Sequence, residues 1–331
     1  MEHNARSLIL TPLDEPFEKH LIEYRCFPHD FVHRGGQGAA RPGNWEELQQ
    51  LISLRQRTSI ESRDYNSETA LASQLASIQA SRRRPKAFFL YAPSILEGTD
   101  DTDLATGIHF EQLKPLTDGS LIAAEPGFYR GANISQLSPP VCEALKSYIV
   151  PSYEKTPILP NFFVEAWPGF SHYRVGIRQS LYIGCMGARA MQALQSYCKP
   201  DLIFDGNAYT IVATYYDDVL ELYSLHPTKP SESGSPIQYH MTRLASFAIR
   251  SVETLRAAMI AYRNLRHWTK EKRDEFIAAA NERVILTFSL MLIKTLAEAK
   301  VSIYSRIGVT NICYRSLKVH SLKLLQFDES R

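Results

Sequence analysis

The order of apolar and polar segments between residues 160 and 227 constrains the fold more than any other feature of the chain. The run PNFFVEAWPG, residues 160–169, is a short apolar segment closed by Pro-Gly, which is typical of a buried strand. Residues 173–197 follow with apolar side chains at helical spacing. Residues 202–227 then read as two strands joined in a hairpin at Asp217-Asp218. A strand, a long helix and a hairpin in this order predict an α/β fold with a mixed sheet flanked by helices, and an α+β arrangement is the alternative.

Further elements are predicted on either side of this segment. Two helices are expected after the hairpin, over residues 241–265 and 270–282, with Thr269 as the N-cap of the second. The apolar run at residues 86–96 predicts another strand or buried segment. The helix over 173–197 carries small residues that would let it lie close to a sheet, namely Gly184, Gly187 and Ala188.

Three regions organise the chain. Residues 1–86 are predicted to form a helical region and a linker, residues 87–283 an α/β core with C-terminal helices, and residues 284–331 a divergent tail without a clear period. The longest apolar run in the tail, Val284 to Ile293, is too short to cross a bilayer, so no membrane association is expected.

Composition excludes some classes of partner and favours an intracellular protein. The 37 basic and 35 acidic residues give a net charge of +2, so no global field favours nucleic acid or membranes. The five cysteines are scattered without the spacing of a zinc site, which indicates reduced thiols. The cluster of Arg82, Arg83, Arg84 and Lys86 resembles a minimal nuclear-import patch, although such a run is also typical of a solvated linker. A cytoplasmic or nuclear location is therefore expected.

Long blocks of the sequence carry a family resemblance. The stretches PNFFVEAWPG, RQSLYIGCMGARAMQALQSY and FDGNAYTIVATYYDDVLELYSLHP together resemble a family of uncharacterised fungal proteins that is similar to the PD-(D/E)XK nuclease superfamily. The resemblance covers about Phe17 to Arg283 and implies a restriction-endonuclease-like core. In that superfamily a magnesium ion lies between carboxylates at two neighbouring strand ends, where it polarises the phosphodiester and activates a water. A lysine two residues after the second carboxylate lies on the same strand face.

This sequence departs from the implied signature at two of three positions. Glu165 is retained, but Trp167 stands where the lysine belongs and Gly127 stands where the partner aspartate belongs. The nearest replacement carboxylate is Glu125, which lies on the same strand face as position 127 if the strand continues. Arg178 on the following helix could approach as a replacement cation, although an arginine cannot act as a general base.

Several residues near this signature are candidates for binding. Gln179 and Tyr182 share a helix face, and the resemblance implies contacts with a DNA backbone; the alternative is that they anchor the helix to the sheet edge. Trp167 is either a core or rim aromatic residue or a stacking surface for a base. A basic stretch on the later helices is either a solvated face or, if it lines the site, a phosphate-contacting surface. That stretch consists of Arg263, Arg266, Lys270, Lys272 and Arg273.

The resulting hypothesis is a nuclease-fold protein that lacks metal-dependent cleavage and a metal cofactor. It would act by binding a protein partner, nucleic acid or a small ligand. The alternative is an active magnesium-dependent DNA or RNA nuclease, with Glu125 and Glu165 as metal ligands and Arg178 in the catalytic set. A third interpretation is unrelated enzyme chemistry in the same cleft, with Trp167 shaping an apolar pocket.

Overall fold

The structure is a computed structural model that describes most of the chain. The described residues are 9–36, 38, 40–54, 68–80, 103–153, 155–167, 172–230, 232 and 234–306. The chain divides into two compact units, residues 1–281 and 282–331. The expected strand at 86–96 and the basic cluster at 82–86 lie outside the described residues.

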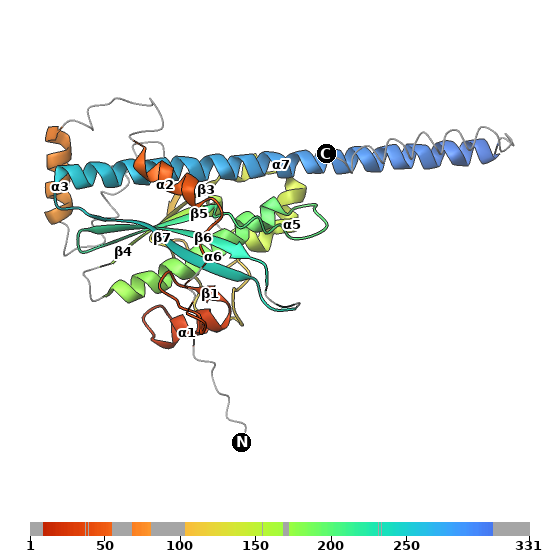
Figure 1. Ribbon diagram of the computed structural model, residues 1–331. Helices are drawn as coiled ribbons and strands as arrows, with labels where there is room; N and C mark the ends of the chain where they lie inside the picture. Colours follow the sequence, from red (N-terminus) through yellow and green to blue (C-terminus); the bar gives the residue numbers. More distant parts are fainter. Residues whose placement is uncertain are drawn as a thin grey trace, which may run out of the picture. The chain divides into compact units, whose positions relative to one another are not determined.

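A seven-stranded mixed sheet forms the centre of the first unit (Figure 1). Its spatial order is β1-β7-β6-β5-β4-β3-β2. The strands are β1 (Cys26–Phe27), β2 (Leu104–Thr106), β3 (Phe128–Ala132), β4 (Ile158–Trp167), β5 (Thr210–Tyr216), β6 (Val219–Thr228) and β7 (Gln238–Ala248). Only the β1–β7 and β4–β5 pairs of this sheet are parallel. Parallel neighbours need a crossover connection, and α6 (Tyr173–Gln195) supplies it between β4 and β5. The predicted α/β fold is confirmed.

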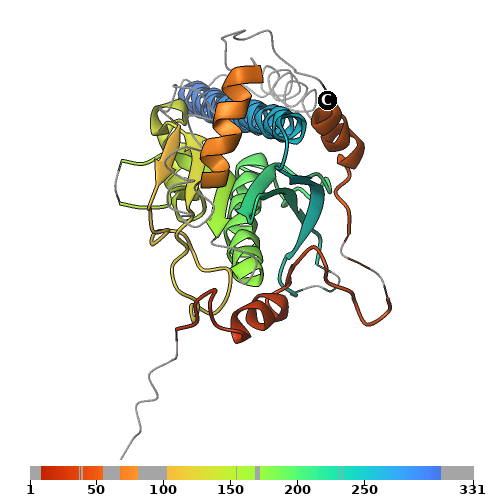
Figure 2. The ribbon, with the colours of Figure 1, turned by 90° about the vertical axis from the view of Figure 1, so that its left-hand side faces the viewer.

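Helices cover both faces of the sheet. In Figures 1 and 2, α6 and the first part of α7 (Val252–Arg306) lie on opposite sides of it. Alternate residues of β4 enter the two cores, because successive side chains of a strand point to opposite faces. Phe163 packs in the core with α6, and Phe162 and Val164 pack in the core with α7.

Shorter helices complete the first unit. They are α1 (Pro16–Glu23), α2 (Trp45–Ser53), α3 (Glu68–Ala80), the 3-10 helix η3 (Ile134–Gln136) and α5 (Pro139–Ile149). Apolar side chains of α2 and α3 join the α7 core, and those of α1 join the α6 core. Among the described residues, no helix has both the length and the apolar character needed to cross a bilayer.

Small residues let α6 lie close to the sheet, as predicted. A Cβ atom on Gly184 would lie 2.5 Å from the side chain of Leu225 on β6. A Cβ atom on Gly187 would lie 2.7 Å from the ring of Phe163 and 2.9 Å from the carbonyl oxygen of Pro160. Both distances are shorter than real Cβ contacts, so the close approach requires glycine.

The predicted hairpin is also present. Asp217 and Asp218 have φ angles of 45° and 65° between β5 and β6. Two consecutive residues with positive φ match a type I′ turn, whose twist suits antiparallel strands, and aspartate tolerates this conformation better than most residues do.

Two expectations about the C-terminal elements were wrong. Residues 238–248 form β7 where a helix beginning at 241 was expected. The alternating side chains of QYHMTRLASFA suit a strand that pairs with β6 along its length. Helix α7 is continuous from Val252 to Arg306, so Thr269 is not an N-cap. The Thr269 hydroxyl donates instead to the Arg266 carbonyl at 2.8 Å, which satisfies a polar side chain within a helix.

Candidate functional site

Glu165 lies near the end of β4 on the face that α6 covers. It stands opposite Thr214 of β5, which stands opposite Glu221 of β6, so the three form a row across the sheet. All three are buried, and the Thr214 hydroxyl lies 2.9 Å from the hydroxyl of Ser180 on α6. The predicted carboxylate is therefore part of a buried polar row beneath α6.

The surroundings of Glu165 favour its neutral form. Burial raises the pKa of Glu165 to about 8; the hydrogen bond from the Gly127 N–H, at 2.9 Å, lowers this pKa and the charge of Glu125 raises it. Glu125 itself is half exposed, and its carboxylate lies 3.5 Å from the His109 ring. Among the described residues, no group of three or more His, Cys, Asp or Glu side chains is placed to hold a metal ion.

The other residues of the expected signature contact neighbouring elements. The Trp167 indole lies against α6 at Gly176, where an added Cβ would be 2.7 Å from the ring. The Arg178 guanidinium donates to the Glu18 carboxylate and to the carbonyls of Pro12 and Asp14, each at 3.3 Å. The structure thus directs Arg178 toward α1 and its preceding loop.

Gln179 and Tyr182 hold α6 to the segment that precedes β3. The Gln179 amide donates to the Glu125 carbonyl at 2.9 Å, and the Tyr182 hydroxyl donates to the Ile122 carbonyl at 3.1 Å. Both polar groups are therefore engaged in fixing the helix to the segment before the sheet.

A second site lies on the opposite face of the sheet, between β3 and α7. Arg266, Lys270 and Arg273 follow one another at spacings of four and three residues, so they form one stripe of α7. Arg130 lies on β3, two residues after Phe128 and hence on the same strand face, which packs against α7. Together they line a cavity of about 420 Å³, which we call the basic pocket. Its lining residues are Asp103, Arg130, Gly131, Asn133, Gln136, Arg266, His267, Thr269, Lys270 and Arg273.

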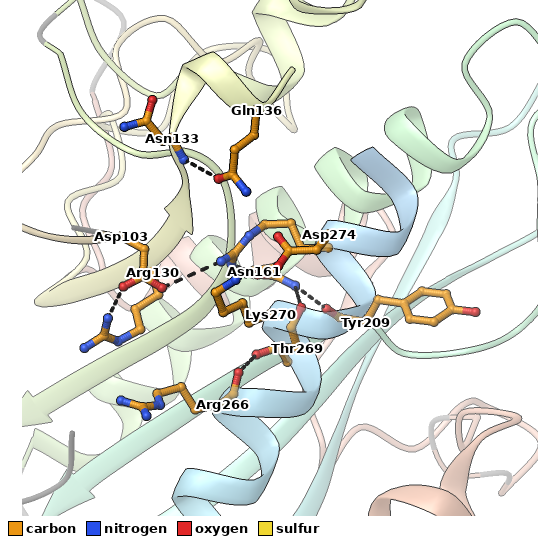
Figure 3. Close-up of polar contacts among 11 residues, drawn as sticks. Asp103, Arg130, Asn133, Gln136, Asn161, Tyr209, Arg266, Thr269, Lys270 and Asp274 are labelled. Carbon is orange, nitrogen blue, oxygen red and sulfur yellow. Dashed lines mark hydrogen bonds and ion pairs between the residues drawn. The ribbon is translucent and has the colours of Figure 1, made fainter. Parts of the chain in front are cut away.

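A hydrogen-bond network fixes the floor of the basic pocket (Figure 3). Asp103 forms an ion pair with Arg130, and its other oxygen lies 3.8 Å from Arg273 Nη2. Arg273 Nη1 donates to Asn161 Oδ1 at 2.6 Å. Asn161 Nδ2 in turn donates to the carbonyls of Tyr209 and Thr269, both at 3.0 Å. One asparagine on β4 therefore connects the sheet, the loop before β5 and α7.

Arg130 and Arg273 of the basic pocket are buried and remain charged. Burial, together with the smaller effect of the charge of Arg266, lowers the pKa of Arg130 to about 10. Burial lowers the pKa of Arg273 to about 10 as well, against the opposing charge of Asp103. Both values lie well above neutral pH, so both guanidinium groups carry their charge at pH 7. Among the described residues, no acceptor contacts the buried Nε of Arg273.

The sequence identified the α7 side of the basic pocket. The basic stretch on the later helices contained Arg266, Lys270 and Arg273, but these residues line a pocket on the face opposite Glu165. Arg130 and Asp103 were missed because they come from segments more than 130 residues earlier and belong to no motif.

Comparisons with family models, curated proteins and solved structures gave no match. The resemblance to the PD-(D/E)XK superfamily therefore stays a prediction from the sequence.

Proposed function

We propose that this chain is a binding protein for phosphate-bearing ligands and that the basic pocket is its binding site. The observation that carries the proposal is the convergence of four cations, from β3 and from one stripe of α7, on a single cavity. Their side chains supply hydrogen-bond donors that match phosphate oxygens, and guanidinium groups can bind such oxygens in pairs.

Acidic side chains accompany some of the cations of the pocket. Asp103 pairs with Arg130, and Asp274 lies 2.5 Å from Lys270 Nζ. Arg266 and Arg273 add two further positive charges to the lining. Phosphate oxygens that enter the pocket would accept charge-assisted hydrogen bonds from its lining cations.

The nuclease-like core remains part of the proposal, with its cleavage chemistry absent. The mixed sheet flanked by α6 and α7, with Glu165 near the end of β4 beside β3, supports such a core. The buried Glu165 carboxyl accepts from the Gly127 N–H at 2.9 Å, and the Glu125 carboxylate lies 3.5 Å from the His109 ring, so each candidate metal ligand already has a protein partner. An intracellular location, where phosphate-bearing molecules are abundant, belongs to the same proposal.

A magnesium-dependent nuclease built on Glu125 and Glu165 is the second candidate. Its test is plasmid and single-strand cleavage with magnesium or manganese. We expect no cleavage above the background of the Glu165→Ala variant. Activity that this substitution abolishes would support the nuclease and contradict the proposal.

Binding is tested by thermal unfolding with inorganic pyrophosphate at constant ionic strength. A ligand that binds only the folded state at 100 times its Kd stabilises it by about 2.7 kcal/mol, which should raise Tm by about 4–8 °C. Double substitution of Arg266→Gln and Lys270→Gln should remove this rise. Lys272→Gln is the matched control, because Lys272 lies on the same helix outside the pocket and pairs with Glu275. An equal rise in all three proteins would place the ligand elsewhere.

A further inference from the structure

We infer that protonation of His226 and His240 releases the β1 segment from the edge of the sheet, so that mild acid opens this edge. The β1 segment is residues 26–33, which comprise β1 and the residues that follow it. Strand β1 is the outermost strand of the sheet and pairs with β7 along its two residues. An edge element held by so short a backbone pairing is expected to open before the centre of the sheet does.

Aromatic rings connect the β1 segment to the two histidines. His226 of β6 stands opposite His240 of β7, and the centroids of their rings lie 5.4 Å apart at an interplanar angle of 29°. His240 stands beside Phe27 of β1, with ring centroids 5.3 Å apart. The rings of Phe31 and His33 lie 4.8 Å and 5.0 Å from that of Phe27 and complete the ring cluster. The ring cluster therefore joins β6, β7 and the β1 segment.

The surroundings of His226 and His240 favour neutral imidazole rings. The two residues are 1 % and 3 % exposed, and within the described part of the chain no partner contacts either Nδ1 atom. A neutral imidazole can leave one nitrogen as an unused acceptor, whereas a protonated imidazole carries an N–H on both nitrogens. Protonation of either ring would therefore bury a charge and an N–H without an acceptor, which destabilises the closed edge.

The groups that face the two histidines mostly oppose their protonation. Burial lowers the pKa of His226 to about 3, and the charge of a protonated His240 lowers it as well. Burial lowers the pKa of His240 to about 4, and the neighbouring His33 adds to this effect. Asp205, in the loop before β5, and a hydrogen bond with the His240 backbone act on His226 in the opposite direction and more weakly. Thr228, whose hydroxyl lies 3.1 Å from His240 Nε2, carries no charge.

Release of the β1 segment follows from the difference in proton affinity between the closed and the open edge. The open edge exposes both rings to water, where the pKa of histidine is about 6.5. The stabilisation that neutral His226 and His240 give to the closed edge is fully present above pH 6.5 and is lost as the pH falls toward 4. Each histidine then favours the open edge by up to about tenfold per pH unit, and the two together by up to about a hundredfold.

The test is hydrogen–deuterium exchange of the full-length protein, read by mass spectrometry of its peptides between pH 4.5 and 7.5. The rates are corrected for the intrinsic pH dependence of amide exchange. In the wild type, the opening equilibrium constant of peptides that contain the β1 segment should rise by about tenfold or more between pH 6.5 and pH 5. Peptides from α6 and β5 should stay protected over the same range.

Two variants assign the effect to the histidines. His226→Phe keeps a stacked ring, His240→Gln keeps a polar group for Thr228, and each removes one titrating imidazole. Each should lower the rise by about tenfold. His109→Gln is the matched control, because His109 is half exposed beside Glu125 and lies outside the ring cluster, and it should keep the wild-type profile.

A corrected exchange rate of the β1 segment that does not change with pH would overturn the inference. An unchanged rise in both variants would overturn it too, because another group would then take up the protons. Exchange that rises equally in α6 and β5 would show unfolding of the whole first unit and contradict a local release. The wild-type profile decides the matter without any variant: opening should take up more than one proton, and a slope of one proton or less contradicts the release by a histidine pair.

Discussion

At the scale of single residues, the two faces of the sheet differ in the charge state of their buried ionisable side chains. Glu165 lies beneath α6 with a single backbone donor on its carboxyl group, and burial favours its proton. Arg273 projects from α7 on the opposite face of the sheet, with Asp103 and Asn161 as partners, and it keeps its charge. A carboxyl group held neutral suits the interior of a folded core, whereas charged guanidinium groups that line a cavity suit anion binding.

The raised pKa of Glu165 predicts a particular pH dependence of stability. The folded pKa of about 8 lies above the unfolded value, so the folded state binds the proton more tightly. The stabilisation that this proton on Glu165 contributes to the folded state is fully present below pH 4. It is lost as the pH rises toward 8, by at most about 1.4 kcal/mol per pH unit. Glu165→Gln retains an acceptor for the Gly127 N–H and removes the titration. Urea unfolding between pH 5 and 9 should therefore show a flatter profile for Glu165→Gln than for the wild type.

The exposed carboxylate Glu111 provides the control for this measurement. Glu111→Gln should keep the slope of the wild type. A Glu165→Gln protein whose free energy of unfolding falls with pH as steeply as that of the wild type would show that Glu165 is already ionised in the folded protein.

At the scale of elements, α6 is positioned by contacts that only small residues allow. Trp167 at the end of β4 packs on Gly176, as Leu225 and Phe163 pack on the later glycines of α6. The helix therefore covers the polar row of Glu165, Thr214 and Glu221 closely.

A double-mutant cycle tests this packing. Gly176→Ala alone should destabilise the protein by about 1–3 kcal/mol, because its Cβ would overlap the Trp167 ring. In a Trp167→Leu background the same substitution should be neutral or stabilising by up to about 1 kcal/mol, since alanine is the better helix former. Chemical denaturation of the four proteins gives the coupling energy. Additive effects would mean that Trp167 does not lie on Gly176.

The elements predicted well were those with a strong local pattern. The β4 strand, the α6 helix and the Asp217-Asp218 hairpin follow from apolar runs, helical spacing and turn residues. The boundary between β7 and α7 was misplaced, because MTRLASFAIR contains both alternating and helical patterns and pairing with β6 decides between them. Thr269 resembled a cap, but a threonine can bond to a carbonyl within a helix.

At the scale of the whole molecule, the basic pocket depends on segments that are distant in sequence. Asp103, Arg130 and Arg273 meet because β2, β3 and α7 lie on one side of the first unit. Local spacing predicts the stripe on α7, but it contains no information about which strand faces that stripe. The sequence therefore located a basic stretch and a carboxylate and left open whether they share one site, and the fold puts them on opposite faces of the sheet.

The central claim is that ligand binding belongs to the basic pocket and not to the region of Glu165. Isothermal titration calorimetry with inorganic pyrophosphate tests it most directly, using the wild type, Lys270→Gln and Glu165→Gln. Loss of one charge-assisted hydrogen bond costs about 1.5–3 kcal/mol, so Lys270→Gln should weaken binding by about tenfold or more, while Glu165→Gln should bind like the wild type. Affinity that falls in Glu165→Gln and persists in Lys270→Gln would contradict the claim.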